Sequence, residues 1–195
     1  MSQNEDLIKL YSGIFGHQVI LKNRKGKIVM IIPKLKPKVP PSEKQLAQRE
    51  RLKQGARYAN YVLETPALFA EYSAKAGKGQ SVYRIALNDF LKPPYIRKID
   101  NSGYHGNIGD RIIVVAGDYF KVTSVTVKIY GEEGKVIEEG ACVQRMPTGN
   151  YEYIATVQIP EQDCKGILAS VTDLPGNVTS FAVGEILTEG RDGKV

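Results

Sequence analysis

The feature of this chain that most constrains its fold is a change of hydrophobic periodicity at Pro93-Pro94. In the stretch just before this point, from residue 42, apolar residues recur at spacings of three and four, which is typical of helices. Beyond it they alternate with polar residues, which is typical of half-buried strands. We expect strands at 96–100, 111–116, 122–130, 135–144, 150–158, 166–172 and 178–183, separated by turns that contain glycine or asparagine. Seven short strands in about 90 residues predict an antiparallel β-sandwich.

The first part of the chain predicts a β-hairpin. Two β-rich runs, 18–21 and 28–32, are joined by a short loop that contains Gly26. Gly13 and Gly16 are expected to break the chain before it. A lone hairpin is only marginally stable in water, so we expect the helices that follow to cover its apolar residues.

Three helices are expected between 42 and 91. Prolines keep the preceding segment extended, and Ser42 with Gln45 forms a capping box that begins a helix ending near Glu64. Thr65-Pro66 and Ser81 begin two shorter helices, at 66–76 and 81–91. The long helix is expected to pack through one narrow stripe, which consists of Arg49, Leu52, Ala56, Ala59 and Leu63.

The predicted fold class is therefore an α+β N-terminal domain, made of the β-hairpin and two or three helices, followed by an all-β immunoglobulin-like sandwich. We place these domains at 1–94 and 95–184. Residues 185–195 are polar and contain two glycines, so we expect a flexible tail there.

Three segments of the second half resemble bacterial immunoglobulin-like domains. Ile108-Gly109-Asp110-Arg111-Ile112 resembles the entry to an early strand, and Gly149-Asn150-Tyr151-Glu152-Tyr153 resembles the opening of a later core strand. Val171-Thr172-Asp173-Leu174-Pro175-Gly176-Asn177-Val178-Thr179 is similar to the hairpin before the last strand, where Asp173 can hydrogen-bond the turn backbone. The chain departs from the antibody pattern because it has no Trp and its cysteines do not fall on the strands that carry the usual bridge.

The first half resembles the N-terminal part of uncharacterised bacterial proteins. In those proteins a basic hairpin precedes a helix of the form Pro-Ser-Glu-Lys-Gln-Leu-Ala-Gln-Arg-Glu-Arg, which this chain carries from Pro41 to Arg51. The resemblance implies an architecture and assigns no activity.

Charge is distributed unevenly along the chain. Residues 1–100 hold 19 Lys or Arg and 8 Asp or Glu, whereas residues 101–195 hold 8 and 13. The segment from Lys22 to Lys38 contains no acid, so its positive potential would attract phosphate groups. Tyr58 and Tyr61 of the long helix could stack on bases. The candidate anion-binding or partner-binding residues are Lys22, Arg24, Lys25, Lys27, Lys34, Lys36, Lys38, Arg49, Arg51, Lys53 and Arg57.

The same residues have a structural interpretation. Lysines and prolines protect exposed strand edges from aggregation, and a charged helix face is commonly just solvated. Sequence-independent nucleic-acid binding is therefore the alternative hypothesis, and a solubilising or protein-docking surface is the leading one.

The remaining candidate groups favour a structural role. A glycine-rich stretch is surrounded by Asp100, His105 and Asp110, which could hold a metal. We interpret this stretch instead as the loop that enters the sandwich. Glu132-Glu133 and Glu138-Glu139 are expected to lie on a solvated hairpin. Gly77-Lys78-Gly79-Gln80-Ser81 lacks the spacing of a phosphate-binding loop. We interpret Cys142 and Cys164 as free thiols, with a single bridge as the alternative.

These observations favour a non-catalytic interaction or assembly protein. We expect no catalytic residue, no cofactor and no metal, and a protein partner or self-association as the mode of action. The start MSQNEDLIKLYSG lacks the apolar core of a secretory signal, and no apolar run reaches the length of a membrane span. A cytoplasmic location without membrane contact is therefore the default expectation.

Overall fold

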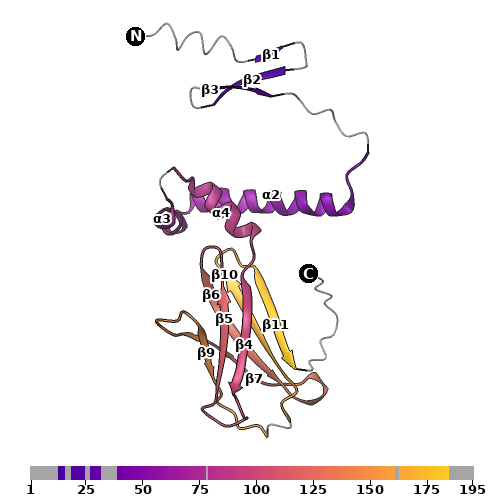
Figure 1. Ribbon diagram of the computed structural model, residues 1–195, viewed down its shortest axis with the longest axis vertical. Helices are drawn as coiled ribbons and strands as arrows, with labels where there is room; N and C mark the ends of the chain where they lie inside the picture. The colour runs from indigo at the N-terminus through magenta and orange to yellow at the C-terminus, as the bar shows by residue number, and fades with distance from the viewer. Residues whose placement is uncertain are drawn as a thin grey trace. The chain divides into compact units, whose positions relative to one another are not determined.

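The computed structural model describes residues 13–15, 19–24, 27–31, 39–77, 79–160 and 163–184. The chain divides into two compact units, residues 1–46 and 47–195, each of which is described by itself. Figure 1 shows the order of helices and strands along the chain. The mixture of helices followed by antiparallel sheets confirms the predicted α+β class.

The first unit contains an antiparallel sheet of three strands in the order β1-β2-β3. The strands are β1 (Gly13–Phe15), β2 (Val19–Arg24) and β3 (Lys27–Ile31). The predicted hairpin strands were too short at the turn. In the structure β2 and β3 extend into the segment expected to be a loop, so that Arg24 pairs with Lys27. The segment from Gly13, expected to break the chain, pairs with β2. Coverage of this sheet by the helices stays a prediction.

Three helices follow in the described part of the chain: α2 (Glu43–Glu64), α3 (Pro66–Lys75) and α4 (Val82–Leu91). The capping box of α2 is confirmed, since the Ser42 N–H donates to Gln45 Oε1 at 3.2 Å and the Gln45 N–H donates to Ser42 Oγ at 3.4 Å. Thr65 and Ser81 occupy the expected N-cap positions, although their side chains make no capping hydrogen bond.

The predicted packing stripe of α2 was confirmed at Ala59 but was wrong at Arg49 and at both leucines. The buried residues are Gly55, Ala59 and Val62, whereas Leu52 and Leu63 are exposed. A Cβ atom at position 55 would lie 3.0 Å from Leu87 Cδ1 and 3.1 Å from Phe90 Cδ1. The absence of a side chain at Gly55 therefore lets α4 pack closely against α2, and this contact selects the buried face.

Two four-stranded antiparallel sheets follow the helices. One has the order β4-β5-β9-β8, the other β11-β10-β6-β7. The predicted strand at 135–144 divides at Cys142, because β7 pairs with β6 in one sheet and β8 pairs with β9 in the other. The strands are β4 (Tyr95–Gly103), β5 (Arg111–Gly117), β6 (Val122–Tyr130), β7 (Val136–Ala141), β8 (Val143–Gln144), β9 (Tyr151–Ile154), β10 (Gly166–Asp173) and β11 (Val178–Gly184).

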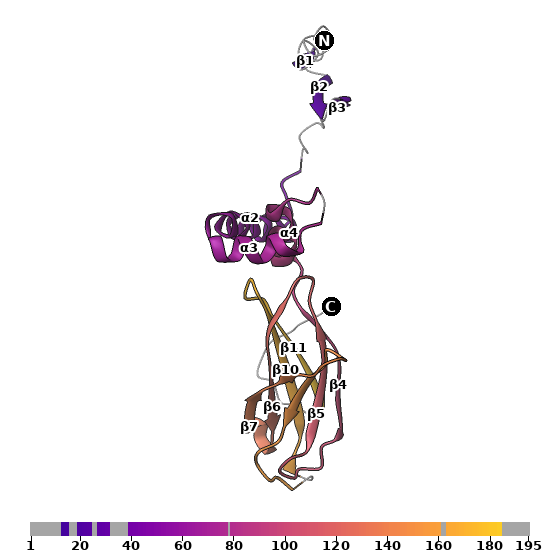
Figure 2. The same ribbon diagram turned by 90° about the vertical axis from the view of Figure 1, so that its left-hand side faces the viewer.

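The two sheets face each other across one shared core (Figure 2). Inward side chains alternate along β5, β6 and β10, as the period of two predicts. One sheet contributes Ile99, Ile112, Val114 and Tyr153, and the other contributes Val125, Val127, Ile129, Ile167, Ala169 and Val171.

A second core joins the helices to one end of the sheets (Figures 1 and 2). It contains Tyr72 of α3 and Ile85 of α4, and the Phe120 ring stacks on Tyr72 with ring centroids 4.1 Å apart. Leu174, from the turn between β10 and β11, packs against the same core. Helices and sheets thus form one compact unit, and the domain boundary expected near residue 94 stays a prediction.

Candidate functional site

The eleven basic candidate residues do not form one described surface. Lys22 and Arg24 lie in β2 and Lys27 lies in β3 of the first unit. The register pairs position 24 with position 27 and position 22 with Val29, which puts the three basic positions on one face of the sheet. Lys25, Lys34, Lys36 and Lys38 lie outside the described residues.

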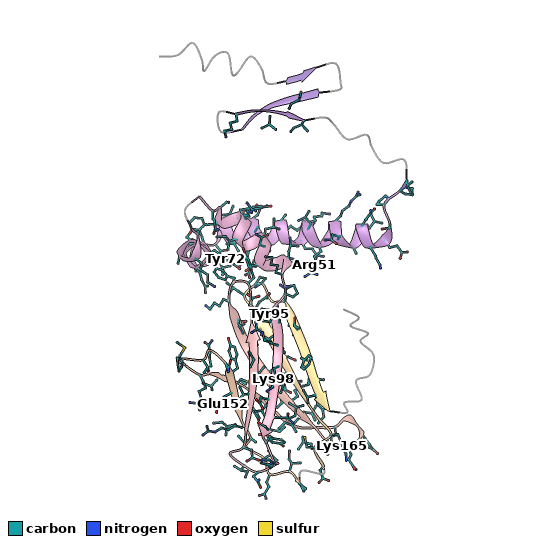
Figure 3. The ribbon with its side chains drawn as sticks, viewed as in Figure 1. Arg51, Tyr72, Tyr95, Lys98, Glu152 and Lys165 are labelled. Atoms are coloured by element: carbon teal, nitrogen blue, oxygen red, sulfur yellow. The ribbon has the colours of Figure 1, made fainter. Side chains whose placement is uncertain are left out.

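The four candidate basic residues of α2 divide between two faces of the helix. Arg49, Lys53 and Arg57 recur every four residues and are exposed, so they form a basic helix face opposite the buried Ala59 side. Lys53 is partly neutralised by Glu50 at 3.8 Å. Arg51 instead donates from Nη2 to the Leu91 carbonyl at 3.3 Å, which anchors α2 to the end of α4 (Figure 3).

Charge is also distributed unevenly between the two units of the chain. Residues 1–46 hold 9 Lys or Arg and 3 Asp or Glu, a net charge of +6, while residues 47–195 hold 18 of each and are neutral overall. The first unit therefore accounts for the entire net charge of the protein.

Tyr58 is not available to stack on bases, contrary to the expectation from sequence. Its hydroxyl shares a hydrogen bond with the Tyr72 hydroxyl at 2.9 Å, and its ring lies 5.7 Å from that of Phe90. Tyr58 faces α3 and α4 because it follows Gly55 by three residues on the buried side of α2. Tyr61 remains 56% exposed.

The glycine-rich segment around His105 is a loop closed by its own carboxylates. Asp110 Oδ2 accepts the backbone N–H groups of His105 at 2.7 Å and Asn107 at 2.8 Å, and these bonds lower the pKa of Asp110. Asp100 pairs with Lys98 at 2.8 Å. Within the described part of the chain, no three His, Cys, Asp or Glu side chains converge to hold a metal ion.

Glu138 is buried, and its assignment to a solvated hairpin was wrong. Its Oε1 accepts hydrogen bonds from Tyr153 Oη at 2.7 Å and from the backbone N–H and hydroxyl of Thr156, each at 2.6 Å. Burial alone would raise the pKa of Glu138, but these donors hold it below its ordinary value. The carboxylate therefore ties β7 of one sheet to β9 and the following loop of the other.

A groove of about 530 Å³ lies beside this carboxylate, between the edge of β7 and the β8–β9 hairpin. On the other side of the two sheets, β4 lies beside β11 and β10, so that side is closed. The groove has both apolar and charged walls, and one wall carries the buried Glu152, which pairs with Arg145 and, at 3.5 Å, with Arg111 (Figure 3). Its lining includes Gly140, Ala141, Val143, Arg145, Glu152 and Ile154.

Two further carboxylates, Asp89 and Asp173, are buried where α4 meets the sheets. The Tyr72 hydroxyl donates to Asp89 Oδ2 at 2.5 Å. As the sequence predicts, Asp173 closes the turn: it accepts the Asn177 backbone N–H at 2.6 Å and the Asn177 side-chain amide at 2.7 Å. The same amide also lies 3.2 Å from the Phe90 carbonyl, which links the turn to α4.

Sequence reasoning missed both the groove and Asp89. The groove forms because the chain changes sheets at Cys142, and no pattern in the run from Val136 to Gln144 marks that change. Asp89 did leave a signal, because it follows the buried Ile85 by four residues and Ala86 by three. A carboxylate on the apolar side of a helix is a candidate for a special environment.

No family model, curated protein or solved structure matches this chain. Among the described helices, none is both long and apolar enough to cross a membrane.

Proposed function

We propose that the protein is a non-catalytic interaction or assembly protein, and that residues 95–184 are an immunoglobulin-like binding or spacer module. The strand orders support this fold: β4-β5-β9-β8 corresponds to the A-B-E-D sheet of immunoglobulin domains, and β11-β10-β6 corresponds to G-F-C with β7 as an added strand. Fold likeness by itself does not assign a function.

The groove between β7 and the β8–β9 hairpin carries the functional proposal. It lies at the open side of the two sheets, and next to it Val143 is 63% exposed. An apolar side chain that faces solvent beside a groove with charged walls is suited to contact another protein surface.

A second copy of the chain is the partner that the charges favour. Residues 1–46 carry a net charge of +6, whereas residues 95–184 hold 8 Lys or Arg and 11 Asp or Glu. Opposite charges on the two parts attract one copy to another and make such contact sensitive to salt.

Sedimentation equilibrium at low and high salt tests this proposal. We expect self-association at low salt, weakened by salt and weakened about tenfold by Val143→Lys, because a charge would be buried in the contact. The matched control is Val178→Lys on β11, which is 60% exposed at the other edge of the sheets and should leave association unchanged. A monomer under all conditions, or equal effects of the two variants, would contradict self-association through the groove.

Sequence-independent nucleic-acid binding is the second candidate, and the concentration of the whole net charge in residues 1–46 favours it. Binding to a labelled duplex and a labelled single strand should weaken steeply with salt. Replacing Lys22, Arg24, Lys25 and Lys27 together by Gln should lower affinity at least about tenfold and reduce the salt slope by about 3.

The control for this experiment is the pair Arg97→Gln and Lys135→Gln, which lies in the neutral second unit. Binding that responds equally to both sets of substitutions, or to neither, would reject the first unit as a nucleic-acid interface.

A further inference from the structure

Two carboxylates at the end of α4 each leave one oxygen without a donor. Asp89 Oδ2 accepts the Tyr72 hydroxyl, and Asp118 Oδ2 accepts the backbone N–H groups of Phe120 at 2.9 Å and Lys121 at 2.8 Å. The Oδ1 atoms of Asp89 and Asp118 are both buried, and neither has a hydrogen-bond partner among the described residues. A buried carboxylate oxygen without a donor is costly, so this pair of atoms requires an explanation.

The two side chains lie within hydrogen-bonding reach of each other. Two ionised carboxylates accept hydrogen bonds only, so a bond between them requires a proton on one. Asp89 is near the end of α4, and Asp118 follows directly after β5. A hydrogen bond between them would therefore connect a helix to the sheets.

We propose that Asp89 and Asp118 share one proton, and that this shared proton is a pH-sensitive latch that holds α4 against the end of the two sheets. When the proton leaves, two like charges face each other in a buried site. Repulsion between them then favours separation of α4 from the sheets.

Other charged and titratable groups reach this junction from each neighbouring element. Tyr58 of α2 and Tyr72 of α3 lie on the helix side, and Asp173 lies at the end of β10. Two lysines at the junction are engaged elsewhere: Lys75 of α3 donates to the Phe120 carbonyl, and Lys121 pairs with Glu71. The carboxylates thus face two tyrosine hydroxyls and a third carboxylate.

The environment also sets the direction of the pH response. Burial, the charges of Asp118 and Asp173 and the bond to Asp118 raise the pKa of Asp89 to about 7, against the opposing effect of the Tyr72 hydrogen bond. The folded protein therefore binds this proton more tightly than the unfolded chain does. Stability from the latch is complete below the ordinary pKa of 3.8 and is lost as the pH rises from there through about 7.

Urea unfolding of the full chain and hydrogen exchange of α4 amides, corrected for intrinsic rates, test the latch between about pH 5 and 8. We expect the opening or unfolding constant of the wild type to rise about 10- to 100-fold across this range, as proton linkage to one such carboxyl requires. In Asp89→Asn the rise should shrink to less than about threefold, because the titrating group is gone. The matched control Asp100→Asn should keep the wild-type profile, since the Lys98 hydrogen bond lowers the pKa of this surface carboxyl to about 2.

Asp118→Asn keeps the experiment decisive if Asp89→Asn does not fold. The amide of Asn at position 118 can donate to Asp89 Oδ1 and removes the like charge, so the pH response should move to lower pH. If the two carboxylates had a purely structural role, replacing either one would lower stability by the same factor at every pH. That outcome, or a wild-type pH profile in Asp89→Asn, would overturn the latch.

Restored stability on adding calcium chloride at pH 8 would also overturn it, by showing that the pair holds a cation in place of a proton.

Discussion

Glu138 and Asp89 are both buried carboxylates, yet their surroundings have opposite effects on them. Glu138, between the two sheets, receives three hydrogen bonds on one oxygen from Tyr153 and Thr156. Asp89, between the helices and the sheets, receives one hydrogen bond from Tyr72 and faces the carboxylates of Asp118 and Asp173. Burial raises the pKa of both groups, so their neighbours make the difference.

This comparison shows that burial alone does not determine how a carboxyl group stabilises a protein. The hydrogen bonds to Glu138 hold its pKa below the ordinary 4.5, so its stabilising contribution exists above that pH and is lost as the pH falls further. The pKa of Asp89 is raised from 3.8 to about 7, so its contribution exists at acid pH and is lost as the pH rises. As the pH rises from acid to neutral, the contact between the two sheets at Glu138 is therefore strengthened. The contact between the helices and the sheets at Asp89 is weakened over the same range.

The largest effect is expected from Glu138→Ala. This change leaves the Tyr153 hydroxyl and both Thr156 donors without their acceptor inside the structure, and it should cost about 3 kcal/mol of unfolding free energy at pH 7. Urea denaturation measures this loss.

Its neighbour Glu139 provides the control for that experiment. Glu139 is exposed and pairs with Lys128 at 3.0 Å, so Glu139→Ala should cost less than about 1 kcal/mol. Similar costs for the two variants would show that Glu138 is not an anchor between the sheets.

A smaller effect is expected from Tyr72→Phe. This substitution removes the hydroxyl that donates to Asp89 but keeps the ring that stacks on Phe120, so it should cost about 1 kcal/mol. Because the lost hydrogen bond favours ionised Asp89, the pH response of stability should also move to higher pH. Urea denaturation at a series of pH values measures both changes.

Tyr61→Phe is the matched tyrosine variant. Tyr61 is 56% exposed on α2, so this change should leave both stability and its pH profile near those of the wild type. A downward movement of the response in Tyr72→Phe would contradict the role given to this hydroxyl.

Much of the fold could be predicted from local patterns. Alternation located the strands of both sheets, except that it gave β7 and β8 as a single strand. Local turn chemistry explained both the capping box at Ser42 and the hydrogen bonds of Asp173 to Asn177. These features depend on residues close together in the sequence.

The remaining features depend on contacts between distant parts of the chain. Gly55 selects the buried face of α2 only because α4 packs there. Glu138 is buried because Tyr153 and Thr156, from the other sheet and the loop after it, supply its donors. The pairing of Asp89 with Asp118 likewise requires the helices to meet the sheets, which neither segment indicates by itself.

The most direct test of this contrast is a carbon-13 NMR titration that follows the carboxyl carbons of Glu138 and Asp89 in the wild-type protein. Glu138 is expected to titrate below its ordinary pKa of 4.5, and Asp89 at about 7. If both carboxyl groups titrated together near 4, the surroundings would not distinguish them, and the account of the two junctions would be contradicted.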